Sequence, residues 1–71
     1  MSVEKGDWVR ITRLCKQRGR VGEVVWVLAR SDENYVQYQV ELFGEPGGSY
    51  TYFFVEIEKI NEMEVIAEAA R

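Results

Sequence analysis

Histidine is absent from this chain of 71 residues, and cysteine occurs once, at Cys15. The lack of histidine removes the commonest general base and the commonest metal ligand in proteins. A lone cysteine cannot form a disulfide within the chain, which is typical of a reducing compartment. Cys15 beside Lys16 is a weak candidate nucleophile, because no histidine is available to activate it. We therefore expect no metal or other cofactor and favour a non-catalytic protein.

The sequence also lacks a long hydrophobic run. No stretch approaches the roughly 18 apolar residues that indicate a membrane-spanning helix, and the N-terminus lacks the basic and then apolar pattern of a signal peptide. We therefore expect a cytoplasmic protein with no membrane partner. The length allows one domain, and a domain of about 60 residues buries only about 60% of its extended-chain surface. The modest stability that follows favours association into a homo-oligomer.

Basic residues are concentrated in the first part of the chain, although the net charge is −3. Residues 1–30 carry a charge of +4, and residues 31–71 carry −7. A basic cluster of this kind is typical of a nucleic-acid site. The alternative is a solvated strand edge and loop that balance the acidic half, and we favour it because that half would repel phosphate. The candidate nucleic-acid contacts are Arg10, Arg13, Lys16, Arg18 and Arg20.

The stretch Arg18–Leu28 predicts a loop that turns into a strand. Gly19 and Gly22 bracket Val21, and glycine is favoured where φ is positive or where two backbones pass closely. Five of the six residues after Gly22 are apolar. A continuous apolar run rich in β-branched residues fits a strand that is buried on both faces. We interpret it as the central strand of a small barrel, running to about Ala29.

Four more strands are predicted, one before this strand in the chain and three after it. The segments Trp8–Leu14 and Tyr35–Phe43 alternate between polar and apolar residues, as half-buried strands do. Ser49–Phe54 is predicted as an aromatic strand, and Val55–Ile60 as a short bend followed by the last strand.

Turn signals separate these strands. Arg30–Asn34 is polar, and Gly44–Gly48 contains the only proline and half of the glycines, so both segments are predicted as turns. Residues 1–5 form a lead without a pattern that we expect to fray; the barrel would occupy residues 6–60 and the last part of the chain residues 61–71. The predicted core consists of Val9, Ile11, Val24, Val27, Val36, Tyr38, Val40, Leu42 and Ile57.

The chain changes character at Asn61. An asparagine followed three residues later by a glutamate is typical of a capping box, and Asn61 with Glu64 meets this pattern. We therefore predict a helix of about eight residues, although residues 62–67 can also be interpreted as the last strand. A helix this short is not stable alone and has to pack on the barrel or on a partner. Its apolar face would consist of Met63, Ile66, Ala67 and Ala70.

Five short strands with a long loop after the first resemble an SH3-like barrel. The predicted fold class is therefore mainly β, a five-stranded SH3-like barrel with a short C-terminal helix. Gly6–Arg10 (Gly-Asp-Trp-Val-Arg) and Gly19–Val24 (Gly-Arg-Val-Gly-Glu-Val) are similar to the KOW motif of ribosomal and transcription-elongation proteins. The same segments resemble the E subunit of cyanobacterial photosystem I. The KOW resemblance implies RNA or DNA binding through the basic segment of residues 10–20, with Trp8 or a tyrosine as a stacking platform.

A third resemblance covers the chain from about Gly6 to Asn61. The type II dihydrofolate reductases carried on plasmids and integrons have a Gly-Asp-x-Val-Arg start, a Tyr-x-Val-Glu strand, a Pro-Gly-Ser turn and a Leu-Glu-Arg-Ile-Asn end. The similar segments of this chain are Gly6–Arg10, Tyr38–Glu41, Pro46–Ser49 and Ile57–Asn61.

The departures from this family fall on its chemistry. The family's active strand reads Val-Gln-Ile-Tyr, and the matching positions here, counted back from Asn61, read Ser-Tyr-Thr-Tyr, so that only Tyr52 is kept. Ile11 and Thr12 replace the family's lysines after Val-Arg. The resemblance implies the scaffold and the oligomeric habit, in which Tyr50 and Tyr52 would face a pore shared by four subunits. It implies altered or lost activity.

Three interpretations of function follow. We favour a non-catalytic SH3-like module that binds another protein or a second copy of itself, because aromatic residues at this density rarely all fit one small core. The alternatives are a KOW-like nucleic-acid-binding domain and an enzyme scaffold like that of the type II dihydrofolate reductases. The predicted ligand or partner surface consists of aromatic residues expected to be exposed, namely Trp8, Tyr35, Phe43, Tyr50 and Tyr52.

Overall fold

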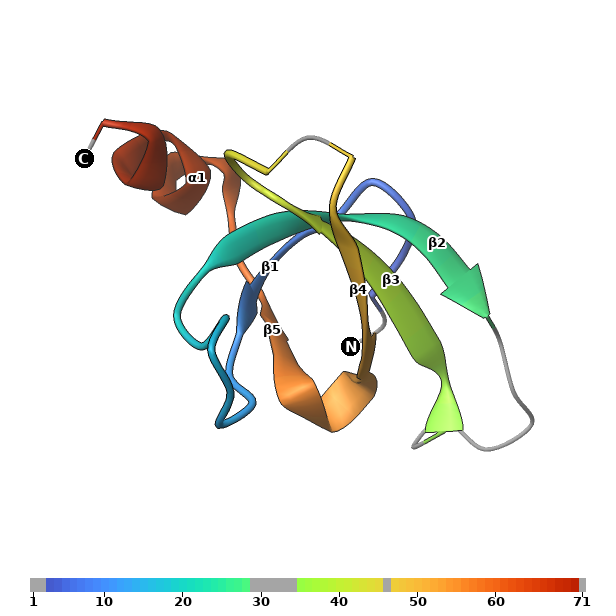
Figure 1. Cartoon of the computed structure of the whole chain (residues 1–71). Helices are drawn as coiled ribbons and strands as arrows, with labels where there is room; N and C mark the ends of the chain where they lie inside the picture. The colour runs from blue at the N-terminus through green and yellow to red at the C-terminus, as the bar shows by residue number, and fades with distance from the viewer. Residues whose placement is uncertain (1–2, 29–34, 46, 71) are drawn as a thin grey trace.

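A computed structural model describes residues 3–28, 35–45 and 47–70 (Figure 1). Five antiparallel strands form one sheet in the order β4-β3-β2-β1-β5. This arrangement confirms a mainly β fold with five strands, with β2 at the centre as predicted, and a short C-terminal helix. The elements are β1 (Trp8–Ile11), β2 (Val21–Leu28), β3 (Gln37–Leu42), β4 (Ser49–Phe53), the 3-10 turn η2 (Phe54–Glu56), β5 (Ile57–Lys59) and α1 (Glu62–Ala69).

The observed strands are shorter than the predicted ones at several ends. β1 ends at Ile11 because the next two backbone N–H groups, those of Thr12 and Arg13, donate to the carbonyl oxygen of Glu56, at 2.9 and 3.1 Å. The chain therefore leaves the sheet and passes against η2 instead of continuing the ladder. In the turn predicted at Gly44–Gly48, the described residues include Gly44 and Gly47 with positive φ angles of 86° and 81°, whereas the predicted turn at residues 30–34 lies outside the described residues.

The sheet curves around a core of inward-facing side chains, and η2 joins its two edge strands (Figure 1). Eight of the nine predicted core residues are buried, and the ninth, Val27, is half-buried and packs against them. The core also contains Val3 and Tyr52. Val3 belongs to residues 1–5, where we expected the chain to fray, and its burial adds an apolar contact from before the first strand. The eight are Val9, Ile11, Val24, Val36, Tyr38, Val40, Leu42 and Ile57.

Gly22 allows β2 and β3 to approach closely. It is buried and lies opposite Leu42 in the register of the two strands. A Cβ atom at Gly22 would lie 2.5 Å from Cγ1 of Val40 and 2.7 Å from the carbonyl oxygen of Glu41. The φ angle of Gly22 is not positive, so that lack of space, and not backbone conformation, requires glycine here.

A β-bulge in β2 changes which side chains face outwards. The register with β3 shifts between Val24 and Trp26, which leaves Val25 as the extra residue. An extra residue reverses the alternation that follows it. Trp26 and Leu28 are consequently exposed, so the interpretation of this strand as buried on both faces is wrong for its second half.

The C-terminal helix is capped as predicted but turned differently. The Glu64 backbone N–H donates to Oδ1 of Asn61 at 3.0 Å, and the Asn61 N–H donates to Oε2 of Glu64 at 3.3 Å. Val65 is the helix residue that packs, in a second cluster with Val21 and Ile60. The predicted apolar face is wrong, because the path of the chain from β5 turns Val65 towards the sheet. Its four residues, Met63, Ile66, Ala67 and Ala70, are exposed.

The contact at Gly22 yields a prediction. We expect Gly22→Ala to lower the free energy of unfolding by about 1–3 kcal/mol, because the added methyl group overpacks against β3. Gly48→Ala is the matched control, since its Cβ would meet its nearest atom, the Glu45 carbonyl oxygen, at an ordinary 3.4 Å. Urea-induced unfolding measures both variants, and a Gly22→Ala protein as stable as the parent would contradict the packing described.

Candidate functional site

Three large apolar side chains are exposed on the outer side of the sheet, two on β2 and one on β4. Trp26 is 57% exposed, Leu28 43% and Phe53 38%. The register places Trp26, Gln39 and Thr51 in one cross-strand row and Leu28, Gln37 and Phe53 in the next. We call these six residues the Trp26 face.

A shallow hollow of about 200 Å³ lies within the Trp26 face, lined by five of its residues and not by Phe53. Polar groups surround the apolar ones. Nε2 of Gln39 donates to Oγ of Ser49 at 2.7 Å, and the Lys5 ammonium lies 5.8 Å from the centre of the Trp26 ring. A mixed surface of this kind, with an exposed aromatic anchor and amide groups beside it, is typical of a site that binds polypeptide.

Two carboxylates border the Trp26 face. Glu23 and Glu41 lie directly opposite each other on β2 and β3, so that their Cβ atoms are about 5 Å apart on the outer side of the sheet. Within the part of the chain that the structure describes, neither forms an ion pair. Like charges in directly opposed positions destabilise a sheet. The pair is therefore a local electrostatic cost that a cation from outside would relieve.

The aromatic residues predicted as the partner surface do not form one patch. Tyr35 and Phe43 are exposed, but they lie beyond opposite ends of β3. Trp8 is half-buried against the cluster under α1, and Tyr50 packs on the core. For Tyr52, at 3% exposed, the prediction of an exposed position is wrong, because its register partner is the inward-facing Tyr38. Tyr50 and Tyr52 thus point into the chain's own core, and neither faces outwards as the dihydrofolate reductase resemblance implied.

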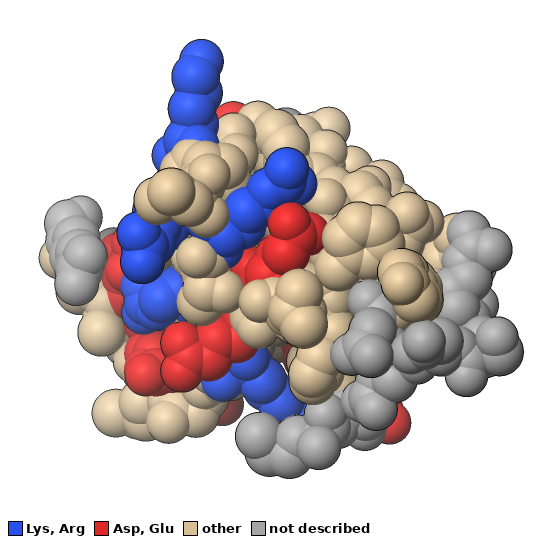
Figure 2. All heavy atoms as spheres, turned by 90° about the horizontal axis from the view of Figure 1, so that it is seen from below, with Lys and Arg blue, Asp and Glu red and all other residues tan. Residues whose placement is uncertain are grey.

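The predicted basic cluster is largely neutralised within the molecule. Arg10 lies 3.9 Å from Glu68, Nε of Arg13 lies 3.1 Å from Oε2 of Glu56, and Arg20 pairs with Glu45. Basic and acidic side chains accordingly lie beside one another in Figure 2. The two remaining members of the cluster, Lys16 and Arg18, are exposed and have no carboxylate partner among the described residues.

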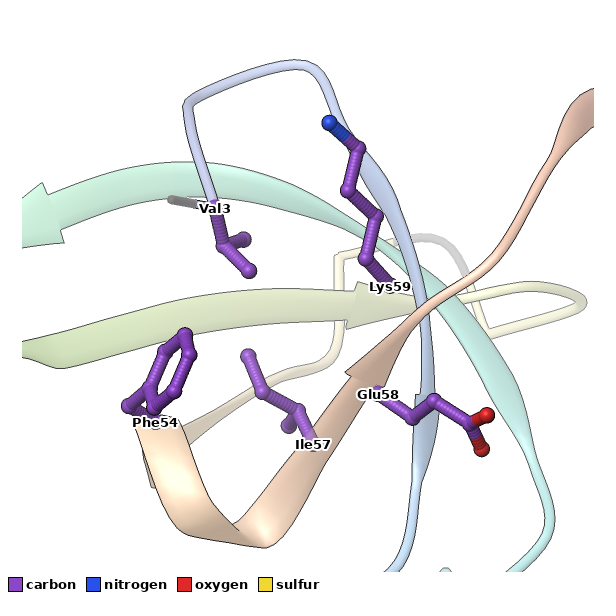
Figure 3. A pocket seen from close by; sticks show the side chains of 5 residues that line it. All are labelled: Val3, Phe54, Ile57, Glu58 and Lys59. Carbon is purple, nitrogen blue, oxygen red and sulfur yellow. The ribbon is translucent and has the colours of Figure 1, made fainter. Parts of the chain in front are cut away.

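A second hollow, of about 260 Å³, lies where the N-terminal segment crosses η2 and β5. The side chains of Val3, Phe54 and Ile57 converge there, and the charged ends of Glu58 and Lys59 lie away from them (Figure 3). Nζ of Lys59 is 3.4 Å from a carboxylate oxygen of Asp7. The hollow thus presents an apolar wall with no ionised group directed into it. Over residues 3–28, 35–45 and 47–70, no group of three His, Cys, Asp or Glu is arranged to hold a metal.

Sequence reasoning missed Trp26 and Leu28 because a continuous apolar run is typical of a strand covered on both faces. The length of the chain does indicate that some residues of this run are exposed. A domain of this size with one short helix cannot cover both faces of a five-stranded sheet, so part of any such run has to face solvent. The bulge at Val25 then decides which members do, and local sequence does not reveal a bulge.

Comparison with models of protein families, with curated proteins and with solved structures finds no match. The resemblances to SH3-like barrels, KOW domains, the photosystem subunit and the type II dihydrofolate reductases stay predictions. Among the described residues, no helix has the length and apolar character needed to cross a membrane.

The buried Tyr52 hydroxyl yields a prediction. It has no hydrogen-bond partner among the described residues, and a buried, unsatisfied polar group costs about 1–3 kcal/mol. We therefore expect Tyr52→Phe to leave the free energy of unfolding at pH 7 unchanged or raised by about 1 kcal/mol. The matched control is Tyr50→Phe on the same strand, and clear destabilisation of Tyr52→Phe alone in urea unfolding would show that the hydroxyl is satisfied.

The same residue predicts a pH dependence. Burial raises the pKa of Tyr52, with a smaller contribution from nearby Cys15. The folded protein therefore holds a proton that the unfolded chain releases above the ordinary tyrosine pKa of about 10. Stability should be retained below pH 10 and fall above it, and Tyr52→Phe should show a weaker fall. Parallel pH profiles of the two proteins would disprove this assignment.

Proposed function

We propose that this chain is a non-catalytic binding module that associates with a second copy of itself through exposed aromatic positions of its sheet. The Trp26 face carries the proposal. It places three large apolar side chains, Trp26, Leu28 and Phe53, in adjacent cross-strand rows on a surface that α1 leaves uncovered. Burying such side chains is the principal driving force for association of proteins.

The distribution of reactive groups supports a binding role over catalysis. The chain has no histidine, and its single thiol, Cys15, packs against the core. The carboxylates of Asp7, Glu45 and Glu56 are each paired with a cation. Covalent and acid–base catalysis require a nucleophile beside a base. The larger hollow is lined by Glu58 and Lys59, but the Lys59 ammonium is paired with Asp7. In the fold, the thiol thus contributes to packing and the three carboxylates to ion pairs.

Nucleic-acid binding is the alternative that the charge pairing disfavours. Arg10, Arg13 and Arg20 already contact carboxylates, so binding phosphate would require breaking these pairs. We expect affinity for duplex DNA or single-stranded RNA to be weaker than about 10 µM at physiological salt. Fluorescence anisotropy checks this, and tighter binding that is lost on removing Lys16 and Arg18 would restore the nucleic-acid interpretation.

Self-association through the Trp26 face can be tested by sedimentation. We expect the chain to associate at about 100 µM, some tenfold above the dissociation constant of a weak dimer. Replacing Trp26 and Leu28 together by serine should weaken association by about tenfold or more, because burial of one large apolar side chain contributes about 1.5–3 kcal/mol.

The control replaces two apolar residues that are even more exposed, Val55 and Met63, by serine. These lie on η2 and α1, outside the Trp26 face. We expect this control to associate like the parent. A parent chain that is monomeric at about 100 µM, or equal weakening by both double variants, would refute the proposed function.

A further inference from the structure

We propose that in this self-association the basic loop of one copy, residues 12–20, binds the Trp26 face and the Glu23–Glu41 pair of another copy. This inference rests on the proposed function and specifies its partner surface. It gives a role to two features of the surface. One is the exposed Leu14 in the basic loop, and the other is the two neighbouring carboxylates, Glu23 and Glu41, which form no ion pair among the described residues.

The loop presents one apolar and two cationic side chains. Leu14 is 84% exposed, the most exposed of the large hydrophobic residues that the structure describes. Lys16 and Arg18 are also exposed, whereas Cys15 and Gln17 between them are half-buried. The loop therefore offers a partner one apolar side chain with two cations beside it.

Hydrogen bonds hold the loop in this conformation. The N–H of Arg18 donates to the Cys15 carbonyl at 3.1 Å, and the N–H of Gly19 donates to the Ile11 carbonyl at 2.8 Å. Nη1 of Arg10 also donates to the Gly19 carbonyl at 2.8 Å. A pre-organised loop loses less conformational entropy on binding, which favours its use as a docking element.

The Glu23–Glu41 pair matches the two cations of the loop in charge and spacing, whereas the Trp26 face itself has one cation beside it, Lys5. Two unpaired cations face two unpaired carboxylates, Glu23 and Glu41, and Leu14 faces the Trp26 face. Glu41 lies two residues from Gln39, the partner of Trp26, which places the acidic pair about 7 Å from the Trp26 row. Leu14 and Lys16 are also two residues apart, a span of at most about 7 Å.

One molecule cannot make the whole of this contact with itself: Glu23 lies only two residues from Val21, but the Trp26 row lies much farther along the strand. The basic loop precedes Val21 at the start of β2, whereas Trp26 and Leu28 lie near the end of the same strand (Figure 1). The five residue steps from Val21 to Trp26 separate the two surfaces by about 16 Å along a rigid strand. The contact is therefore between copies. The contact closes as a two-fold dimer if each copy places its loop on the face of the other, and otherwise it continues into a ring or a filament.

Charge reversal provides the test, measured by sedimentation velocity on full-length chains. The loop variant is Lys16→Glu with Arg18→Glu, and the face variant is Glu23→Lys with Glu41→Lys. Each alone should associate at least about tenfold more weakly than the parent, because like charges then meet. An equimolar mixture of the two should associate again, since each acidic loop meets a basic face. The chain with all four substitutions, whose net charge equals that of the parent, should associate by itself.

The outcomes separate this inference from the proposed function. Far-ultraviolet circular dichroism and thermal unfolding verify that each variant is folded. A monomeric parent refutes the proposed function and this inference together. If the parent and the loop variant associate equally, the contact between loop and face is wrong while self-association stands. If both double variants are monomeric and neither the mixture nor the fourfold variant recovers, the two charge pairs do not meet.

Discussion

The close contact between β2 and β3 at Gly22 is the constraint on which the rest of this small fold depends. With hydrogen at this position, the Cγ1 atom of Val40 and the Glu41 carbonyl occupy space that a Cβ would fill. β2 is the central strand, and it pairs with β1 on its other side through the same residue, opposite Val9. A single layer of five strands can enclose a core only by curving tightly, and interior packing tolerates little change in volume at such a point.

The outer side of the sheet is covered unevenly, which leaves the Trp26 face exposed. Val65 of α1 covers Val21 and Ile60 at one end of β2. No described helix covers Trp26 and Leu28 at the other end, where both remain exposed. Since the bulge at Val25 turns these two side chains outwards, the same irregularity that adapts the strand to the curve also creates the Trp26 face.

Some charged side chains of the molecule form ion pairs within the fold, and others do not. Arg10, Arg13 and Arg20 are used within the fold, each with a glutamate from the acidic half of the chain. Exposed ion pairs contribute little to stability individually, but they remove these arginines from the set that is free to meet a partner. Among the described charges outside these ion pairs are Lys16 and Arg18 in the loop after β1, and Glu23 and Glu41 on the sheet.

The sequence by itself determined the mainly β class, the central position of β2, the capping box at Asn61 and nearly all of the core. These depend on alternation, turn residues and local hydrogen bonding, which act over a few neighbouring residues. Tertiary structure alone decided that Tyr52 is buried, that Val65 and not Met63 faces the sheet, and that Trp26 is exposed. The register between strands, the bulge and the path of the chain into α1 set these orientations. Each arises from contacts between residues far apart in the chain, which a local pattern does not contain.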